Sequence, residues 1–199
     1  THMIYHVMPL AGDSEHLWRR HVQWIREVRS QFNGRLIVGI LTPGDGEPRV
    51  YNSVDDVITA FDGLDAEFIV AKNDFIPGRK GRGEGVTFIR MLEKIETTNP
   101  NHVFFYGHTK TVTRPEERED AAVHKWTKAI FNTTFRNRHG VIDELDDNAI
   151  TGSCRVRASK SNRVSQWFYG GTFFACRCDQ VFSRNWKKLT SNYGCVEMW

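Results

Sequence analysis

Short apolar runs alternate with helix-type patterns over the first 110 residues of the chain. Four of these runs predict strands, because each is brief, rich in β-branched or aromatic residues and closed by a turn signal: Ile4–Met8, Arg35–Thr42, Ala66–Ala71 and Val103–Tyr106. The second run is almost continuously apolar, which is typical of a strand buried on both faces of a parallel sheet.

Helical patterns separate the strands. A helix after Ser14 ends at Asn33-Gly34, Ser53 is expected to cap a short helix through Phe61, and a third helix begins near Glu84. Alternating strands and helices predict βαβ units, and therefore an α/β, Rossmann-like fold with a mostly parallel central sheet flanked by helices.

The pattern changes in the last third of the chain. We expect a helix over 115–135, a shorter one ending near Leu145, strands over 149–156 and 167–176, and a helix over 181–189. The chain shows no repeat, low-complexity tract or linker, so its 199 residues predict a single domain, 1–199. Its first three residues resemble the remnant of an expression tag.

Composition and charge narrow the class of protein. Hydrophobic residues make up 40% of the chain and charged residues 26%, which is ordinary for a globular domain. The net charge of +3 favours anionic ligands but falls short of the strong basic stripe typical of nucleic-acid binding. No stretch has the length of a membrane span and no signal peptide is visible, so we expect a cytoplasmic protein.

The four cysteines allow two interpretations. Cys176 and Cys178 would share one face of a strand, so a zinc site with Cys154 and Cys195 is geometrically conceivable. Their spacing matches no familiar zinc motif, which favours reduced thiols, some of them buried.

A glycine-rich basic loop follows the third predicted strand. Residues 73–85 contain four glycines interleaved with Arg79, Lys80 and Arg82. Glycines let the backbone approach a ligand, the cationic side chains attract phosphate, and the next helix would point its positive end at the same region. The loop has neither a Walker A ending nor a G-x-G-x-x-G turn, and it can equally be a solvated surface loop.

The fourth predicted strand opens onto His108, Thr109 and Lys110. A metal-dependent transferase often presents two carboxylates here to hold Mg²⁺ or Mn²⁺, and this segment has none. Lys110 and His108 could offset diphosphate charge in place of a metal, or His108 could contribute one metal ligand. A lone histidine at a strand end can also be structural.

Two later segments complete the candidates. The Gly170-Gly171 break in the aromatic run that begins Trp167-Phe168-Tyr169 would let a ligand approach the backbone, with Trp167 and Tyr169 as stacking surfaces beside it. The same break can also be a β-bulge. Glu197 stands among apolar neighbours, which tend to raise the pKa of a carboxylate and suit it to act as a general base. A glutamate near a chain end is also often merely exposed.

In their order along the chain, these four segments resemble a GT-A-like glycosyltransferase group. They read Gly78-Arg79 through Gly83-Glu84-Gly85, then Phe-Tyr-Gly-His-Thr-Lys, then Tyr-Gly-Gly-Thr-Phe-Phe-Ala-Cys-Arg, then Tyr-Gly-Cys-Val-Glu-Met-Trp. Related patterns occur in bacterial polysaccharide-synthesis transferases of the rhamnan-synthesis type and in uncharacterised bacterial and phage proteins. The resemblance covers the chain from about Met8 to Trp199.

The resemblance implies a role for each matching position. It assigns nucleotide-sugar contacts to Gly78, Arg79, Gly83, His108, Thr109 and Lys110, and the sugar or acceptor site to Gly170, Gly171 and Thr172. Arg82 joins the first group because of its charge, and Trp167 and Tyr169 join the second as stacking surfaces. Glu197 matches the position where inverting enzymes of this type keep their base. The Asp-x-Asp segment that holds Mg²⁺ or Mn²⁺ in typical members is replaced by His-Thr-Lys.

The leading hypothesis is therefore an enzyme that moves a sugar from a nucleoside diphosphate-sugar to an acceptor hydroxyl. One alternative is a nucleotide- or glycan-binding module without turnover, which the missing Asp-x-Asp favours. Another is a transferase acting on nucleic acid, whose phosphates could be contacted by the basic residues Arg155, Arg157, Lys160 and Arg163.

Overall fold

The computed structural model describes residues 1–12, 15–75, 83–109, 121–157, 167–169 and 172–188. Its strands are β1 (His2–Val7), β2 (Leu36–Thr42), β3 (Ala66–Lys72), β4 (Val103–His108), β5 (Ile150–Gly152), β6 (Arg155–Arg157), β7 (Trp167–Tyr169) and β8 (Phe174–Arg177). Its α-helices are α1 (Glu15–Val28), α2 (Val54–Ala60), α3 (Gly85–Ile95), α5 (Ala121–Phe131), α6 (Arg138–Asp147) and α7 (Cys178–Phe182). Short helical turns follow α1, α5 and α7: η2 (Arg29–Gln31), the π-type η3 (Asn132–Arg136) and η4 (Trp186–Lys188).

Six strands form the main sheet in the order β3-β2-β1-β4-β8-β5. The first four strands of the chain are parallel to one another, whereas β8 is antiparallel both to β4 and to β5. The prediction of an α/β fold with a mostly parallel sheet is confirmed. Among the described residues, β6 and β7 pair only with each other, in a second, two-stranded sheet.

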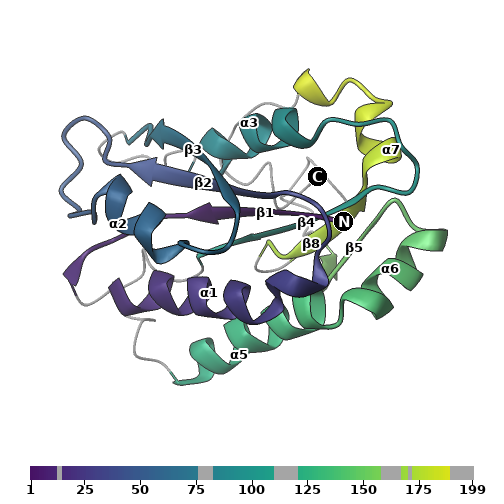
Figure 1. The fold of residues 1–199 in the computed structure, drawn as a ribbon, viewed down its shortest axis with the longest axis horizontal. Coiled ribbons are helices and arrows are strands. Elements are labelled where there is room, and N and C mark those ends of the chain that lie inside the picture. Colours follow the sequence, from purple (N-terminus) through teal and green to yellow (C-terminus); the bar gives the residue numbers. More distant parts are fainter. Residues whose placement is uncertain (13–14, 76–82, 110–120, 158–166, 170–171, 189–199) are drawn as a thin grey trace.

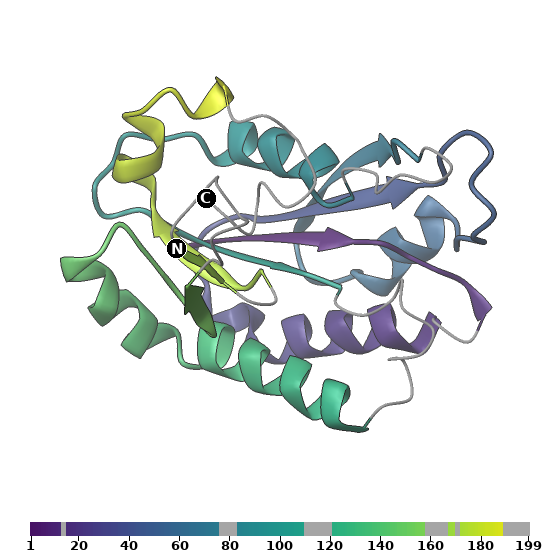
Figure 2. The ribbon, with the colours of Figure 1, turned by 180° about the vertical axis from the view of Figure 1, so that it is seen from behind.

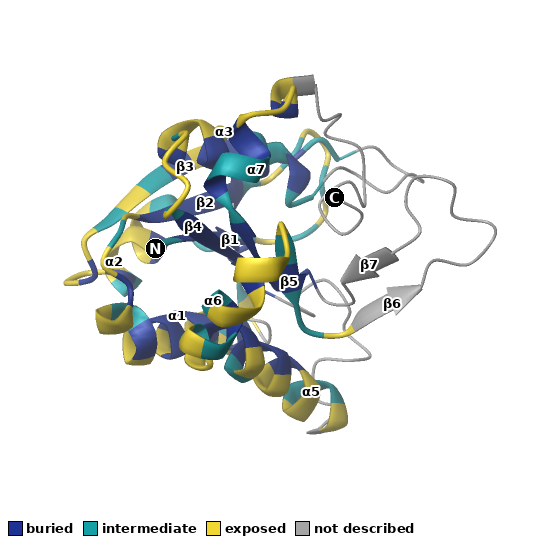
Figure 3. Ribbon diagram, turned by 90° about the vertical axis from the view of Figure 1, so that its right-hand side faces the viewer, coloured by how far each residue is buried: buried dark blue, intermediate teal, exposed yellow. Residues whose placement is uncertain are grey.

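Helices cover both faces of the main sheet. Helices α1, α5 and α6 lie on one face and α3 and α7 on the other (Figure 1), and the reverse view shows the same layers (Figure 2). Side chains of β1 alternate between the two layers, because successive strand residues point to opposite faces: Met3, Tyr5 and Val7 pack with α1, and Ile4 packs with α3. The sheet is accordingly the buried centre of the molecule (Figure 3). Within the described ranges, no helix has the length and apolar character that a membrane crossing requires.

Two predicted strands in the last third of the chain are wrong in extent. The run 149–156 divides into β5 and β6 at Cys154, which has a φ of +56°, and the run 167–176 divides into β7 and β8, with Thr172 at a φ of +57°. A residue in the left-handed region turns the chain out of the extended conformation, so each run contributes to two sheets.

Two further predictions are wrong. One is the helix over 181–189, and the other is the shared strand face of Cys176 and Cys178. Helix α7 already begins at Cys178 and ends at Phe182, so the two thiols belong to different elements. Both are buried, and burial raises the pKa of Cys178 to about 12. Among the described residues no group of three or more His, Cys, Asp and Glu side chains could hold a metal ion; Cys195 lies outside them.

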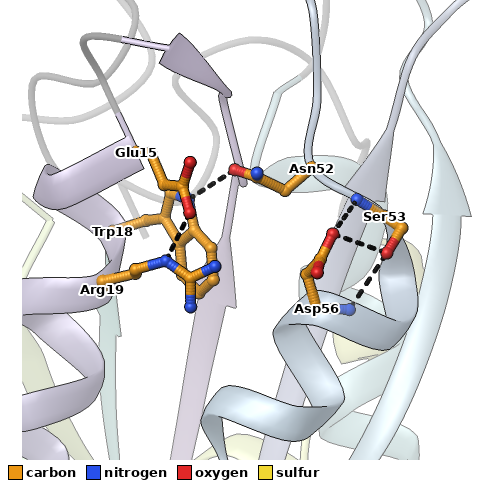
Figure 4. A network of polar contacts seen from close by, with 6 residues as sticks. All are labelled: Glu15, Trp18, Arg19, Asn52, Ser53 and Asp56. Atoms are coloured by element: carbon orange, nitrogen blue, oxygen red, sulfur yellow. Dashed lines mark hydrogen bonds and ion pairs between the residues drawn. The ribbon is translucent and has the colours of Figure 1, made fainter.

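The loops that follow β1 and β2 are tied to each other at the carboxyl edge of the sheet. The Asn52 backbone N–H donates to the carbonyl of Pro9 (2.7 Å), and the Trp18 indole donates to the Asn52 side chain (3.0 Å). Figure 4 shows this contact beside the start of α2, where Ser53 and Asp56 form a capping box. The sequence-based prediction that Ser53 caps α2 is confirmed.

Candidate functional site

The chain reverses its direction of travel across the sheet between β1 and β4. It adds β2 and then β3 on one side of β1, and afterwards places β4 on the other side. In open α/β sheets, ligands bind outside the carboxyl ends of the strands at such a switch point. Here the ends of β1 and β4 bring His6 and His108 directly opposite each other in the ladder.

Alternation along the two strands puts both histidines on the face that α3 covers. Ile4 and Phe104, an even number of positions from the histidines on their strands, pack in the same cluster as residues of α3. The first turn of α3 adds Glu84 and Thr87 to the same region. We refer to His6, Glu84, Thr87, His108 and Thr109 as the switch-point cluster.

His6 is held by polar contacts on both its side chain and its backbone. Its Nδ1 lies 2.7 Å from the Thr87 hydroxyl oxygen, and its carbonyl accepts from the Thr109 N–H at 3.0 Å. The Thr109 hydroxyl in turn accepts from the Met8 N–H at 3.0 Å. Burial lowers the pKa of His6 to about 4, with a further lowering from His108 and an opposing effect of Glu84. The ring is therefore neutral at neutral pH.

The side chains of Glu84 and His108 are in contact across the switch point. Nδ1 of His108 lies 2.9 Å from Oε2 of Glu84. The exposed fraction is 15% for the His108 side chain and 16% for the Glu84 side chain. Glu84 is the N-cap residue of α3, preceded by Gly83 in the left-handed region (φ +52°). When His108 is protonated, the carboxylate beside it neutralises its charge.

On the opposite face of the sheet, Tyr5 supports the end of β4. Its hydroxyl donates to the carbonyl of His108 (3.2 Å) and lies 2.5 Å from Nδ1 of His21. Burial raises the pKa of Tyr5 and lowers that of His21 to about 3. A Cβ on Gly107 would lie 2.6 Å from the Tyr5 ring, so glycine is required for Tyr5 to reach this carbonyl.

Thr172 lies at the same edge of the sheet. Phe174 pairs with Tyr106 in an antiparallel ladder, so the residues before Phe174 run beside the end of β4. Thr172 is fully buried, and a β-branched residue at a φ of +57° carries backbone strain of the kind that concentrates at functional sites. The ring of the adjacent Phe173 lies 5.8 Å from that of His108.

Four of the residues that the sequence singled out therefore meet at the switch point: Gly83, His108, Thr109 and Thr172. Trp167 and Tyr169 lie in β7, which pairs with β6 rather than with the main sheet. The remaining candidates lie outside the described residues: Gly78, Arg79, Arg82, Lys110, Gly170, Gly171 and Glu197.

Sequence reasoning missed His6 and Thr87 as site residues. It named Glu84 as a helix start and as part of the Gly83-Glu84-Gly85 motif, but gave it no role in the site. For His6 a signal was present, because a histidine interrupts an apolar run that ends at Pro9, and its position is the last but one of β1. Thr87 and Glu84 gave no comparable signal, since polar residues in the first turn of a helix are common.

The described residues do not fit a site for Mg²⁺ or Mn²⁺. Such ions prefer carboxylate and carbonyl oxygens, whereas β4 ends in His108 and Thr109. Glu84 is paired with an imidazole, and no cluster of three candidate ligands is found among the described residues.

Comparisons with protein-family models, with curated proteins and with solved structures found no match to this chain. Its function is therefore argued from the switch-point cluster and from the order of its sequence motifs.

Proposed function

We propose that this protein is a GT-A-like glycosyltransferase, which transfers a sugar from a nucleoside diphosphate-sugar to an acceptor hydroxyl. The observation that carries the proposal is the contact between Glu84 and His108 at the switch point. It joins the end of the glycine-arginine segment to the start of the His-Thr-Lys segment at the edge where α/β sheets bind ligands.

In the proposed reaction the acceptor oxygen bonds to the anomeric carbon of the donor. The bond between that carbon and the diphosphate oxygen breaks, and the diphosphate leaves with the electron pair. Glu197 takes the proton of the acceptor hydroxyl, so the anomeric centre is inverted. This role of Glu197 comes from the resemblance to inverting enzymes.

The contact between Glu84 and His108 narrows the set of residues that can offset the negative charge of the leaving diphosphate. Because Glu84 neutralises a protonated His108, that histidine adds little net positive charge. Stabilisation of the diphosphate is therefore assigned to Arg79, Arg82 and Lys110, with the N-terminus of α3 contributing its partial positive charge. His108 and Glu84 act by holding the ligand-binding edge in one geometry.

One observation favours a second candidate, a module that binds a nucleotide or a glycan without turnover. The strand end that holds the metal in typical GT-A enzymes carries His108 and Thr109 instead of two carboxylates. Binding without transfer or hydrolysis would be the outcome that supports this alternative.

A paired binding and turnover assay tests the proposal. Thermal shift with UDP, GDP and CDP, with and without Mn²⁺, should raise the melting temperature for at least one nucleotide, because a ligand that binds the folded state stabilises it. The matching nucleotide-sugar should be hydrolysed or transferred, and Glu197→Gln should slow turnover by about 10²-fold or more. A protein that neither binds nor turns over any of these compounds would refute the proposal.

A further inference from the structure

The hydrogen bonds around Thr87 determine which nitrogen of His6 carries the proton. The Thr87 hydroxyl donates to the carbonyl of Glu84 (3.3 Å), and a hydroxyl has only one proton to donate. We assign the 2.7 Å contact with Nδ1 of His6 as one in which Nδ1–H donates to the hydroxyl oxygen, because only this arrangement satisfies both contacts of Thr87. The neutral ring of His6 then bears its lone pair on Nε2.

The position of the Thr87 hydroxyl is itself constrained by β2. A Cβ on Gly39 would lie 2.6 Å from Oγ1 of Thr87, so only glycine at this position leaves room for the hydroxyl. Thr87 is fully buried, and only 3% of His6 is exposed. The tautomer is thus set by packed groups from β1, β2 and α3.

Nε2 of His6 is suited to accept a hydrogen bond from a ligand. Among the described residues the only side-chain hydrogen bond of His6 is the one through Nδ1. Burial keeps the ring neutral, since it lowers the pKa to about 4, and Glu84 and His108 are the charged or titratable groups that act on it. A neutral Nε2 can accept from a hydroxyl or N–H but cannot donate to a phosphate oxygen.

We propose that Nε2 of His6 accepts a hydrogen bond from a hydroxyl of the donor sugar bound at the switch point, and that Thr87 is the positioning residue that fixes its tautomer. The assignment rests on the proposed function. It follows that His6 distinguishes the sugar part of the ligand from the diphosphate, because the diphosphate offers only acceptor oxygens to this nitrogen.

The tautomer is measurable in the protein without ligand. Nitrogen-15 NMR of the histidine rings should show His6 protonated at Nδ1 at pH 7, and Thr87→Ser should preserve this signature. Thr87→Val, which keeps the shape but removes the hydroxyl, should abolish it. A His6 ring protonated at Nε2 in the wild-type protein would overturn the assignment.

Titration calorimetry with a nucleoside diphosphate and with its sugar conjugate separates this inference from the proposed function. The probes are UDP with UDP-glucose, and GDP with GDP-mannose. His6→Asn retains an amide donor for Thr87 but lacks Nε2, and it should bind the sugar conjugate about tenfold more weakly, the loss expected for one hydrogen bond. Its affinity for the nucleoside diphosphate should change less than about twofold.

Two variants of Thr87 keep the test decisive if His6→Asn folds poorly. Thr87→Val should weaken binding of the sugar conjugate several-fold, and Thr87→Ser should restore it. Equal affinities of all the folded variants for the conjugate would overturn the role of His6 and leave the proposed function standing. Wild-type protein that binds neither these four probes nor CDP would overturn both.

Discussion

Helices α2 and α3 both begin at the carboxyl edge of the sheet, but their first turns are stabilised in different ways. At α2 the Ser53 hydroxyl accepts from the Asp56 N–H (3.1 Å), and the Asp56 carboxylate accepts from the Ser53 N–H (2.9 Å). At α3 the N-cap residue Glu84 makes no such bond with its side chain and contacts His108 of β4 instead. The start of α2 is closed by its own residues, whereas the start of α3 depends on a distant strand.

This difference indicates where function is to be sought. A carboxylate at a helix N-terminus stabilises the helix. The carboxylate of Asp56 serves that purpose alone, through a local capping box. The carboxylate of Glu84 is directed instead to His108 of β4, at the switch point of the sheet.

The largest expected effect is that of Glu84→Gln. Without its ion pair His108 loses its fixed orientation, and misplacement of a positioning group can lower turnover on the order of a hundredfold. Nucleotide-sugar turnover measures the effect. Glu96→Gln is the matched control, because Glu96 is the C-cap residue of the same helix and forms an exposed ion pair with Lys187 (3.0 Å). Equal activity of the two variants would contradict the role of Glu84.

The buried histidines and the capping box of α2 should also differ in their response to pH. His6 and His21 have pKa values of about 4 and about 3 in the folded protein, below the ordinary 6.5, because burial disfavours the charged ring. The unfolded chain therefore binds more protons below pH 6.5, and folding stability should fall as the pH drops from 6.5 towards 4. The expected loss between pH 7 and pH 5 is on the order of 2 kcal/mol per histidine.

Urea denaturation at pH 7 and pH 5 measures this loss, and His6→Asn should reduce it. The contribution of the α2 capping box to stability should not change between pH 7 and pH 5, because hydrogen bonds with Ser53 hold the pKa of Asp56 below its ordinary 3.8. The contribution of Asp56 is therefore lost only at more acidic pH. Unchanged stability between pH 7 and pH 5 would show that the two rings are not buried in the neutral form.

A smaller effect is expected for Ser53→Ala. Loss of a serine N-cap lowers the free energy of unfolding by about 1 kcal/mol. Affinity for the nucleotide-sugar should stay unchanged, because the capping box makes no contact with the switch-point cluster among the described residues. If Ser53→Ala greatly weakened nucleotide-sugar binding and left the urea midpoint almost unchanged, the start of α2 would belong to the binding site, contrary to this prediction.

The smallest effect should come from Asp45→Asn in the loop after β2. Asp45 pairs with Lys72, and 94% of the Asp45 side chain and 56% of the Lys72 side chain are exposed. Exposed ion pairs contribute little, so the free energy of unfolding should change by no more than about 0.5 kcal/mol. The neighbouring Glu47 is the useful contrast, since its side chain is fully buried and accepts from Gly44, Tyr51 and Asn73. Glu47→Gln should be clearly more destabilising in the same urea assay.

The sequence allowed the main elements to be predicted wherever the signal is local. The apolar run 35–42 became β2 almost to the residue, and Ser53 caps α2 as predicted. The strands of the last third could not be delimited in this way. Their boundaries depend on left-handed conformations at Cys154 and Thr172, residue types that do not ordinarily indicate such a conformation.

Part of the candidate site was also accessible from sequence. His108 and Thr109 were recognisable as the polar end of an apolar strand. His6 stood out only as a histidine within an apolar run, because its importance comes from lying opposite His108 in the ladder between β1 and β4. Which strands become neighbours is a property of the whole sheet, so no pattern within β1 alone could reveal this pair.

By itself, then, the sequence determined where the strands and helices of the first 110 residues form and how α2 begins, because hydrophobic periodicity and capping act between residues a few positions apart. Only the tertiary structure decided that Glu84 meets His108, that Thr87 sets the tautomer of His6, and that Tyr5 supports the end of β4 from the opposite face. These contacts arise from strand order and helix packing, which bring together side chains that are far apart in the chain.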